Sequence, residues 1–85
     1  MTEPELRELA LRVLRKIAPE ADPARIDPRE DLREQLDLDS MDFLNFVIGL
    51  HEALGVDIPE ADYARLSSLD GIAQYLGEKV PGAAR

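Results

Sequence analysis

The sequence predicts an all-α fold: a small bundle of three main helices and one short helix, with a long loop between the first two main helices. Residues 3–17 and 40–54 repeat apolar side chains at helical spacing, and residues 69–76 do so over a shorter stretch. No segment alternates apolar and polar residues as a half-buried strand would. The 85 residues suffice for one domain. We expect it to span residues 1–80, with a frayed tail over residues 81–85.

The first helix is expected over residues 3–17. Thr2 and Glu5 have the spacing of a capping box, and Pro4 is tolerated in the first turn of a helix. Pro19 follows the last periodic residue and cannot continue the helix. The apolar stripe that would face the core consists of Leu6, Leu9, Ala10, Val13, Leu14 and Ile17.

Residues 18–39 form the long loop. Prolines at positions 19, 23 and 28 prevent a long helix in this segment. A structureless loop of this length is uncommon in a small domain. We therefore expect Ile26, Leu32 and Leu36 to fix it onto the core, with one helical turn near residues 30–35.

The second main helix is expected over residues 40–54. Asp39 and Ser40 stand at its start, where short polar side chains accept hydrogen bonds from free backbone N–H groups. Gly55 follows its end, where a left-handed cap favours glycine. Pro59 opens a short helix over residues 59–65.

The last helix is predicted from Leu69 onward. Ser67 and Asp70 have the spacing of a second capping box, and Gly77, Pro81 and Gly82 are expected to end the helix. The apolar stripe of this helix consists of Leu69, Ile72, Ala73 and Leu76.

The helix over residues 40–54 carries two apolar faces. One face suits the core and consists of Phe43, Phe46, Val47, Leu50 and Leu54. Met41, Leu44 and Ile48 lie on the opposite side of the helix. A bundle helix needs only one apolar stripe. The second stripe is therefore either covered by the long loop or exposed for a partner, and we favour the exposed arrangement.

Charge is segregated along the chain, whose formal net charge is −8. Residues 30–62 carry ten acidic residues and one basic residue, Arg33, so this segment sums to −9 and the rest to +1. A solvated acidic face is the usual explanation of such a run. Here the acids surround the second apolar stripe, which suits docking onto basic partner surfaces. The same charge argues against direct nucleic-acid binding.

Several chemistries are excluded by the residues present. The chain has no cysteine, hence no disulfide and no thiol nucleophile. Ser40 and His51, the single histidine, are eleven positions apart on one helix, roughly 16 Å, so they form no catalytic pair. An EF-hand loop that begins at Asp37 would place Asp42 where glycine is required, and no metal site is expected. No apolar run reaches the length of a membrane span, and the N-terminus is unlike a secretory signal. We therefore expect a cytoplasmic protein.

Ser40 is the residue with two interpretations. A serine at a helix start is most often a cap. However, Asp39-Ser40-Met41 follows Leu36-Asp37-Leu38, and this stretch resembles the attachment motif of acyl carrier proteins. The resemblance continues through Gly55-Val56-Asp57-Ile58-Pro59 to Ser67-Ser68-Leu69, and it covers the predicted order of helices along nearly the whole chain.

The resemblance implies a non-catalytic carrier. A phosphopantetheinyl transferase would attach 4'-phosphopantetheine from coenzyme A to Ser40, with Asp39 helping to present the serine. The thiol of the arm would then hold an acyl group as a thioester for acyl-loading and acyl-transferring enzymes of fatty-acid, lipid or polyketide-like biosynthesis. A monomer is expected. The surface that docks these enzymes is expected to comprise Met41, Asp42, Leu44, Asn45, Ile48, His51 and Glu52.

The sequence also departs from the family pattern. Asp37 stands where glycine is frequent, and Asn45 and His51 replace glutamates on the partner face. Gly49 is expected to leave space in the interior. These departures favour a specialised carrier. An aminoacyl carrier of the D-alanyl type and an unmodified acidic helical adaptor, in which Ser40 is only a cap, remain open.

Overall fold

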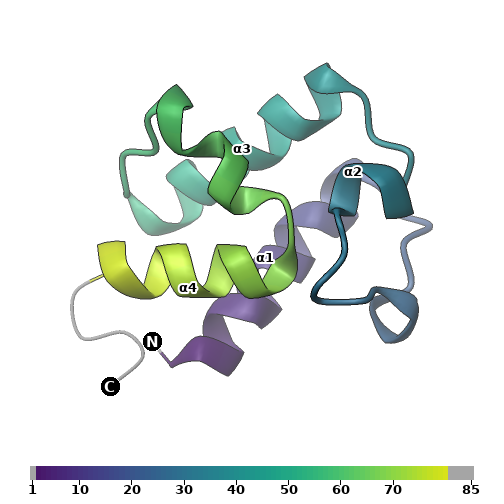
Figure 1. Cartoon of the computed structure of the whole chain (residues 1–85), viewed down its shortest axis with the longest axis horizontal. Coiled ribbons are helices and arrows are strands. Elements are labelled where there is room, and N and C mark those ends of the chain that lie inside the picture. Colours follow the sequence, from purple (N-terminus) through teal and green to yellow (C-terminus); the bar gives the residue numbers. More distant parts are fainter. Residues whose placement is uncertain (1, 81–85) are drawn as a thin grey trace.

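The computed structural model describes residues 2–80, which contain helices and no strand (Figure 1). The α-helices are α1 (Glu3–Ile17), α2 (Leu32–Gln35), α3 (Ser40–Leu54) and α4 (Leu69–Lys79), and the 3₁₀ segments are η1 (Pro23–Arg25) and η2 (Glu60–Leu66). The predicted all-α bundle, with its long loop between the first two main helices, is confirmed. The frayed tail expected over residues 81–85 lies outside the described residues.

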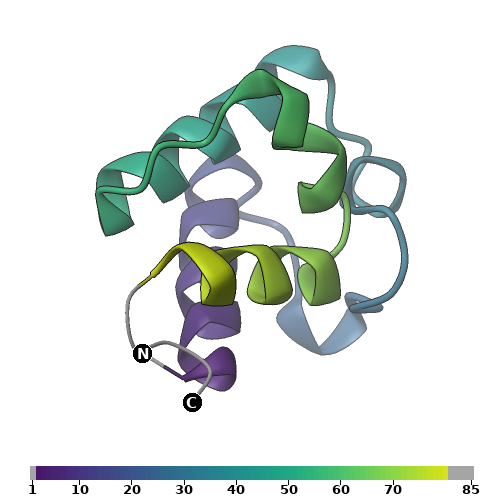
Figure 2. The same ribbon diagram turned by 60° about the vertical axis from the view of Figure 1, so that its left-hand side comes forward.

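The three long helices share one core. α1 packs against both α3 and α4, and η2 packs against α4. Figure 2 shows α4 crossing α1 at a steep angle, with α3 and η2 above them. The largest fully buried side chains come from all three helices and include Leu6, Leu14, Phe46, Leu50 and Tyr75.

The first helix begins as its sequence predicts. The Thr2 Oγ1 accepts a hydrogen bond from the Glu5 N–H (3.4 Å), and the Glu5 carboxylate accepts one from the Thr2 N–H (2.9 Å). This is a complete capping box. α1 ends at Ile17, before Pro19.

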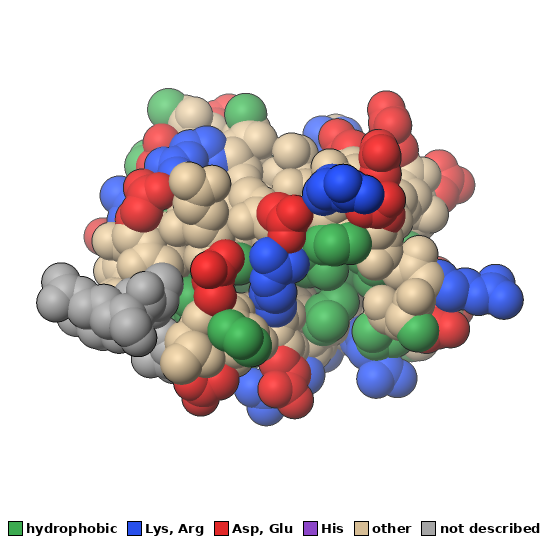
Figure 3. Space-filling view, turned by 60° about the horizontal axis from the view of Figure 1, so that its bottom comes forward, with side chains coloured by type: hydrophobic (Ala, Val, Ile, Leu, Met, Phe, Trp, Pro, Cys, Tyr) green, Lys and Arg blue, Asp and Glu red, His purple; other side chains and the backbone are tan. Residues whose placement is uncertain are grey.

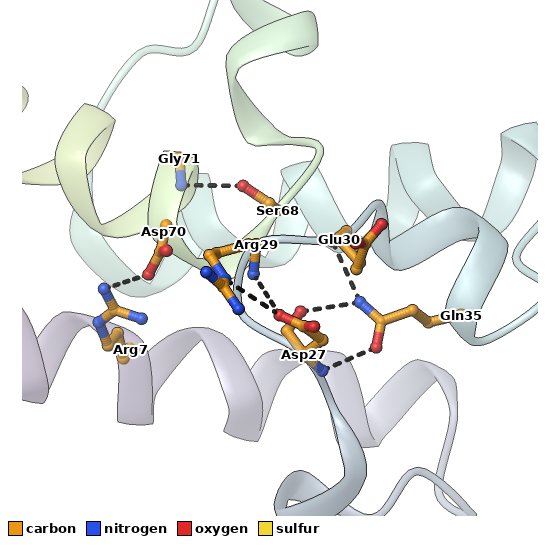
Figure 4. Close-up of polar contacts among 8 residues, drawn as sticks. All are labelled: Arg7, Asp27, Arg29, Glu30, Gln35, Ser68, Asp70 and Gly71. Carbon is orange, nitrogen blue, oxygen red and sulfur yellow. Dashed lines mark hydrogen bonds and ion pairs between the residues drawn. The ribbon is translucent and has the colours of Figure 1, made fainter.

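The long loop is fixed by buried side chains and by one glutamine. Ile26 and Leu32 are buried, and Leu36 packs partly buried against the core. The Gln35 amide donates to the carbonyls of Asp27 (2.9 Å) and Glu30 (3.1 Å) and accepts from the Asp27 N–H (2.8 Å) (Figure 4). The expected helical turn is α2, which these contacts hold against the rest of the loop.

The start of α4 differs from its prediction by one residue. The N-cap is Ser68, whose Oγ accepts from the Gly71 N–H (3.1 Å, Figure 4). Ser67 instead ends η2 with helical backbone angles, and its carbonyl accepts from the Leu32 N–H (2.7 Å). The prediction of a capping box formed by Ser67 and Asp70 was therefore wrong.

The end of α4 lies just before Pro81, one of the three residues expected to end the helix. The helix runs through Gly77 to Lys79, and Val80 adopts an extended conformation (φ −93°, ψ 118°). Val80 precedes Pro81, and the residue before a proline is disfavoured in the helical region. Of the residues expected to end α4, Pro81 therefore sets the boundary, and Gly77 lies inside the helix.

The space beside Gly49 is occupied by a neighbouring side chain. A Cβ at this position would lie 2.5 Å from Cγ1 of Val13 on α1. The expectation that this glycine leaves space was wrong, because the Val13 side chain occupies it. Gly49 lets α1 and α3 approach closely.

Gly49→Ala is therefore expected to destabilise the protein. Alanine favours a helix over glycine by about 1 kcal/mol, but overpacking a core typically costs about 1–3 kcal/mol. We expect the free energy of unfolding to fall by about 1 kcal/mol, measured by urea denaturation. The double variant Gly49→Ala with Val13→Ala should lose less than the sum of the two single variants. A gain of stability in Gly49→Ala would contradict the close packing.

Because the Tyr75 side chain is buried and its hydroxyl is hydrogen-bonded, we expect the protein to lose stability at high pH. Its ring is fully buried, and its hydroxyl donates to the Asp62 carboxylate (2.6 Å). Burial, and then the hydrogen bond to Asp62, raise the pKa of Tyr75 to about 12 from its ordinary value of 10.0. The stabilisation is complete below the unfolded pKa, near pH 10, and is lost as the pH rises toward the folded value.

Urea denaturation between about pH 9 and about pH 12 tests this prediction. The free energy of unfolding should fall across that range in the native chain, because the unfolded state releases the Tyr75 proton first. The decline should be shallower in Tyr75→Phe, which keeps the ring but has no proton to lose. Equal slopes in the two proteins would refute the assignment to Tyr75.

Candidate functional site

At the start of α3 the Ser40 hydroxyl takes no part in capping the helix. Asp39 is the N-cap: its carboxylate accepts from the Asp42 N–H (2.8 Å), and the Asp42 carboxylate accepts from the Asp39 N–H (3.4 Å). This reciprocal pair is a capping box. Ser40 is the first helical residue and is exposed. Because Asp39 does the capping, the interpretation of Ser40 as the cap was wrong.

The turn before α3 has a left-handed residue. Asp37 has φ 53°, the one positive value outside glycine in the described residues. The Leu38 N–H donates to the Arg33 carbonyl (2.9 Å), as in the Schellman end of a helix. This conformation suits glycine best and is tolerated by aspartate. The departure at Asp37 therefore leaves the expected backbone intact.

Ser40 borders a hollow and a basic side chain. Nη2 of Arg33 lies 3.3 Å from the Ser40 Oγ, and the Arg33 guanidinium lies 5.5 Å from the centre of the Phe43 ring. The hollow has a volume of about 430 Å³. Its lining comprises Asp31, Arg33, Ser40, Phe43, Leu44, Tyr63, Ala64 and Ser67. From the sequence, Arg33 stands out only as the single base of an acidic segment, and nothing in the sequence predicts its place beside the serine.

The second apolar stripe of α3 is exposed. Met41 is 63% exposed, Leu44 37% and Ile48 43%. The opposite face is buried as predicted at Phe43, Phe46, Val47 and Leu50, and Leu54 is half-buried. The alternative in which the long loop covers the stripe is excluded.

The other residues expected on the docking surface differ in their exposure and in their neighbours. Asp42 is half-buried in the capping box, and Asn45 is exposed. His51 is exposed, with Nδ1 2.7 Å from the Val56 carbonyl. Glu52 is exposed and borders a hollow shared with Arg12 and Lys16 of α1. Glu52 is therefore near basic side chains, which the sequence pattern did not predict.

The acidic excess is not uniform over the surface. Figure 3 shows a face on which acidic and basic side chains are interspersed, with hydrophobic side chains between them. Ion pairs of this mixed kind join Arg7 to Asp70 and Arg65 to Glu78. Although acidic residues are concentrated in one segment of the sequence, not every face of the folded protein therefore carries charge of a single sign.

Two further properties concern residues 2–80. None of the helices described there is both long and apolar enough to cross a membrane. That part of the chain also has no cluster of three or more histidine or acidic side chains placed to hold a metal ion.

Comparison with known proteins gives a consistent result. The family model described as "Phosphopantetheine attachment site" matches residues 4–76. An acyl carrier protein of Thermosynechococcus vestitus is 29% identical over 69% of this chain and 73% of its own length. An acyl carrier protein of Campylobacter hominis is 31% identical over 85% of both chains. "Polyketide-8 synthase acyl carrier protein 2" of Streptomyces avermitilis is 33% identical over 89% of this chain and 82% of its own.

The helical bundle and the matched residues define a phosphopantetheine-binding carrier domain. The chain belongs to the acyl carrier protein family. Members of this family carry a group for enzymes and do not convert it themselves, and the family implies a covalently attached 4'-phosphopantetheine. The surroundings of Ser40 fit such a group, because its hydroxyl is exposed, is not used as a cap and borders an open hollow.

Proposed function

We propose that residues 1–80 form one monomeric carrier domain that holds an acyl group as a thioester on a 4'-phosphopantetheine arm attached to Ser40. The observation that carries this proposal is the exposed hydroxyl of Ser40, which does not cap the helix. The carboxylates of Asp39 and Asp42 each accept a hydrogen bond from the other residue's backbone N–H at the start of α3. The adjacent serine is left exposed and available for modification.

The attachment is a phosphoryl-type transfer. The Ser40 Oγ attacks the β-phosphorus of coenzyme A, the bond from that phosphorus to 3',5'-ADP breaks, and 3',5'-ADP leaves. The serine proton passes to a base of the transferase, which also supplies the magnesium site. The first turn of α3 favours the negative charge that becomes attached. Asp39 contributes by fixing the backbone that presents Ser40. The attached group supplies the thiol that this chain lacks.

The docking surface is proposed to centre on Met41, Leu44 and Ile48. An exposed apolar stripe on a helix is a typical site for a partner protein. Around it stand the polar and acidic side chains of Asp42, Asn45, His51 and Glu52. The negative charge of Asp42 and Glu52 would attract basic surfaces of the transferase and of acyl-loading and acyl-transferring enzymes.

The pathway is proposed to be specialised and of the polyketide type. The relative named for a polyketide synthase aligns over 89% of this chain at 33% identity, slightly above the Campylobacter relative at 85% and 31% and further above the Thermosynechococcus relative at 69% and 29%. Asn45 and His51 on the docking surface also alter the charge that a fatty-acid partner would meet. The other candidate cargo is an aminoacyl group, as in D-alanyl carriers.

The experiment that tests the proposal uses the apo protein, coenzyme A, magnesium and a broad-specificity phosphopantetheinyl transferase. Intact-mass measurement should show one added arm, and fragmentation should place it on Ser40. An unmodified chain would favour the acidic adaptor instead. Incubation of the holo protein with acyl-loading or aminoacyl-loading enzymes then separates the two cargo classes.

A further inference from the structure

Arg33 is an unusual side chain in its surroundings. It is the single base among residues 30–62, which hold ten acids. Within the described residues, no carboxylate lies within 4.0 Å of its guanidinium, as is also true of Arg12 and Arg15, whereas Arg7, Arg25, Arg29 and Arg65 each have one at that distance. The partner of Arg33 is instead the Ser40 hydroxyl, 3.3 Å away.

Two features hold Arg33 in this place. Its backbone carbonyl accepts from the Leu38 N–H (2.9 Å), which closes the turn between α2 and α3. The Asp31 carboxylate caps the start of α2. The Arg33 guanidinium lies 5.5 Å from the centre of the Phe43 ring, within the range of a cation–π interaction. The contact with Ser40 is therefore supported from both the backbone and the side chain.

The chemistry of the contact indicates an anion. A guanidinium at a neutral hydroxyl has unused donors, because arginine carries five N–H groups. Arginine and phosphate form short, charge-assisted and often bidentate hydrogen bonds. Once Ser40 carried a phosphodiester, the phosphorus would be bonded to the Oγ, and the free phosphate oxygens, two bonds from the Oγ, would be within reach of these donors. The arm also adds negative charge to the most acidic segment of the chain, which only Arg33 offsets.

We propose that Arg33 binds the phosphodiester of the arm and holds the root of the arm beside the hollow at Phe43. This inference rests on the proposed attachment to Ser40. Arg33 acts as a positioning residue for the arm, since it takes no part in the chemistry of the thiol. It also compensates the charge that modification introduces.

The test compares three holo proteins: the native chain, Arg33→Gln and the control Arg29→Gln. Arg29 is an exposed arginine of the same loop that faces Asp27 and not Ser40. Intact mass confirms complete modification, and circular dichroism of the apo forms confirms the fold. The measurement is the ³¹P NMR shift of the phosphodiester as sodium chloride is raised from low concentration to about 1 M, which screens the ion pair.

In the native chain and in Arg29→Gln, the ³¹P resonance should move with salt. In Arg33→Gln, most of this movement should be lost, and the starting shift should lie near the high-salt position of the native chain. Arg33→Lys keeps the charge without the planar fork, so it should retain salt dependence with a different starting shift. The melting temperature should also fall more on modification of Arg33→Gln than on modification of the native chain.

Two outcomes overturn this inference in distinguishable ways. If the native chain accepts the arm at Ser40 but Arg33→Gln shows the native salt dependence, Arg33 does not bind the phosphate and the carrier function stands. If the native chain accepts no arm, the proposed function fails and the role of Arg33 fails with it.

Discussion

Ser40→Ala is expected to abolish attachment of phosphopantetheine while leaving the fold unchanged. The hydroxyl is the only group of this side chain that can form the ester, so no fraction of the chain should gain the arm. Ser40 is exposed and is not the cap of α3. The melting temperature should therefore change little, as is usual for surface substitutions that touch no cap. Intact-mass measurement after incubation with coenzyme A, magnesium and transferase reads the outcome.

Ser67→Ala is the matched control for this variant. Ser67 borders the same hollow as Ser40, but its recorded contact with α2 is made by its backbone carbonyl. The control should accept one arm as the native chain does. Modification of Ser40→Ala, or loss of modification in Ser67→Ala, would assign the attachment to another residue.

The helices could be predicted from the sequence because their signals are local. Apolar periodicity, the Thr2–Glu5 box and Gly55 (φ 65°) set the bounds of α1 and α3 without reference to the rest of the fold. The error at the start of α4 arose where the rest of the fold intervened. Two adjacent serines could each cap α4, and the hydrogen bond from the Leu32 N–H to the Ser67 carbonyl favours the second.

The site was harder to predict from the sequence, because part of it also depends on contacts between different elements of the fold. Ser40 and the stripe on α3 follow from positions on a single helix. Arg33 lies seven residues before Ser40 on a different helix, and the turn at Asp37 brings the two together. The contact of Gly49 with Val13 joins α1 to α3 across the core. Neither contact has a local signature in the sequence.

Ile48→Arg is expected to impair partner enzymes without unfolding the protein. Ile48 is 43% exposed on α3, so an arginine head group can reach water there. The helical circular-dichroism spectrum and the melting temperature should stay close to those of the native chain. Central apolar anchors of an interface can each contribute about 2 kcal/mol or more. Modification by the transferase, or transfer by an acyl-loading enzyme, should weaken by about tenfold or more, equivalent to about 1.4 kcal/mol.

Leu50→Arg and Gln74→Arg are the controls that give this prediction its meaning. Leu50 is fully buried on the opposite face of α3, where an unpaired charge costs several kcal/mol, a large part of the stability of a small domain. That variant should unfold.

Gln74 is exposed on α4, so Gln74→Arg changes the net charge by the same amount as Ile48→Arg, but away from the stripe. It should leave both stability and modification near native values. If Ile48→Arg unfolds as Leu50→Arg does, Ile48 belongs to the core. If Gln74→Arg weakens modification as strongly as Ile48→Arg, the effect is one of total charge, and the exposed stripe does not dock the enzymes.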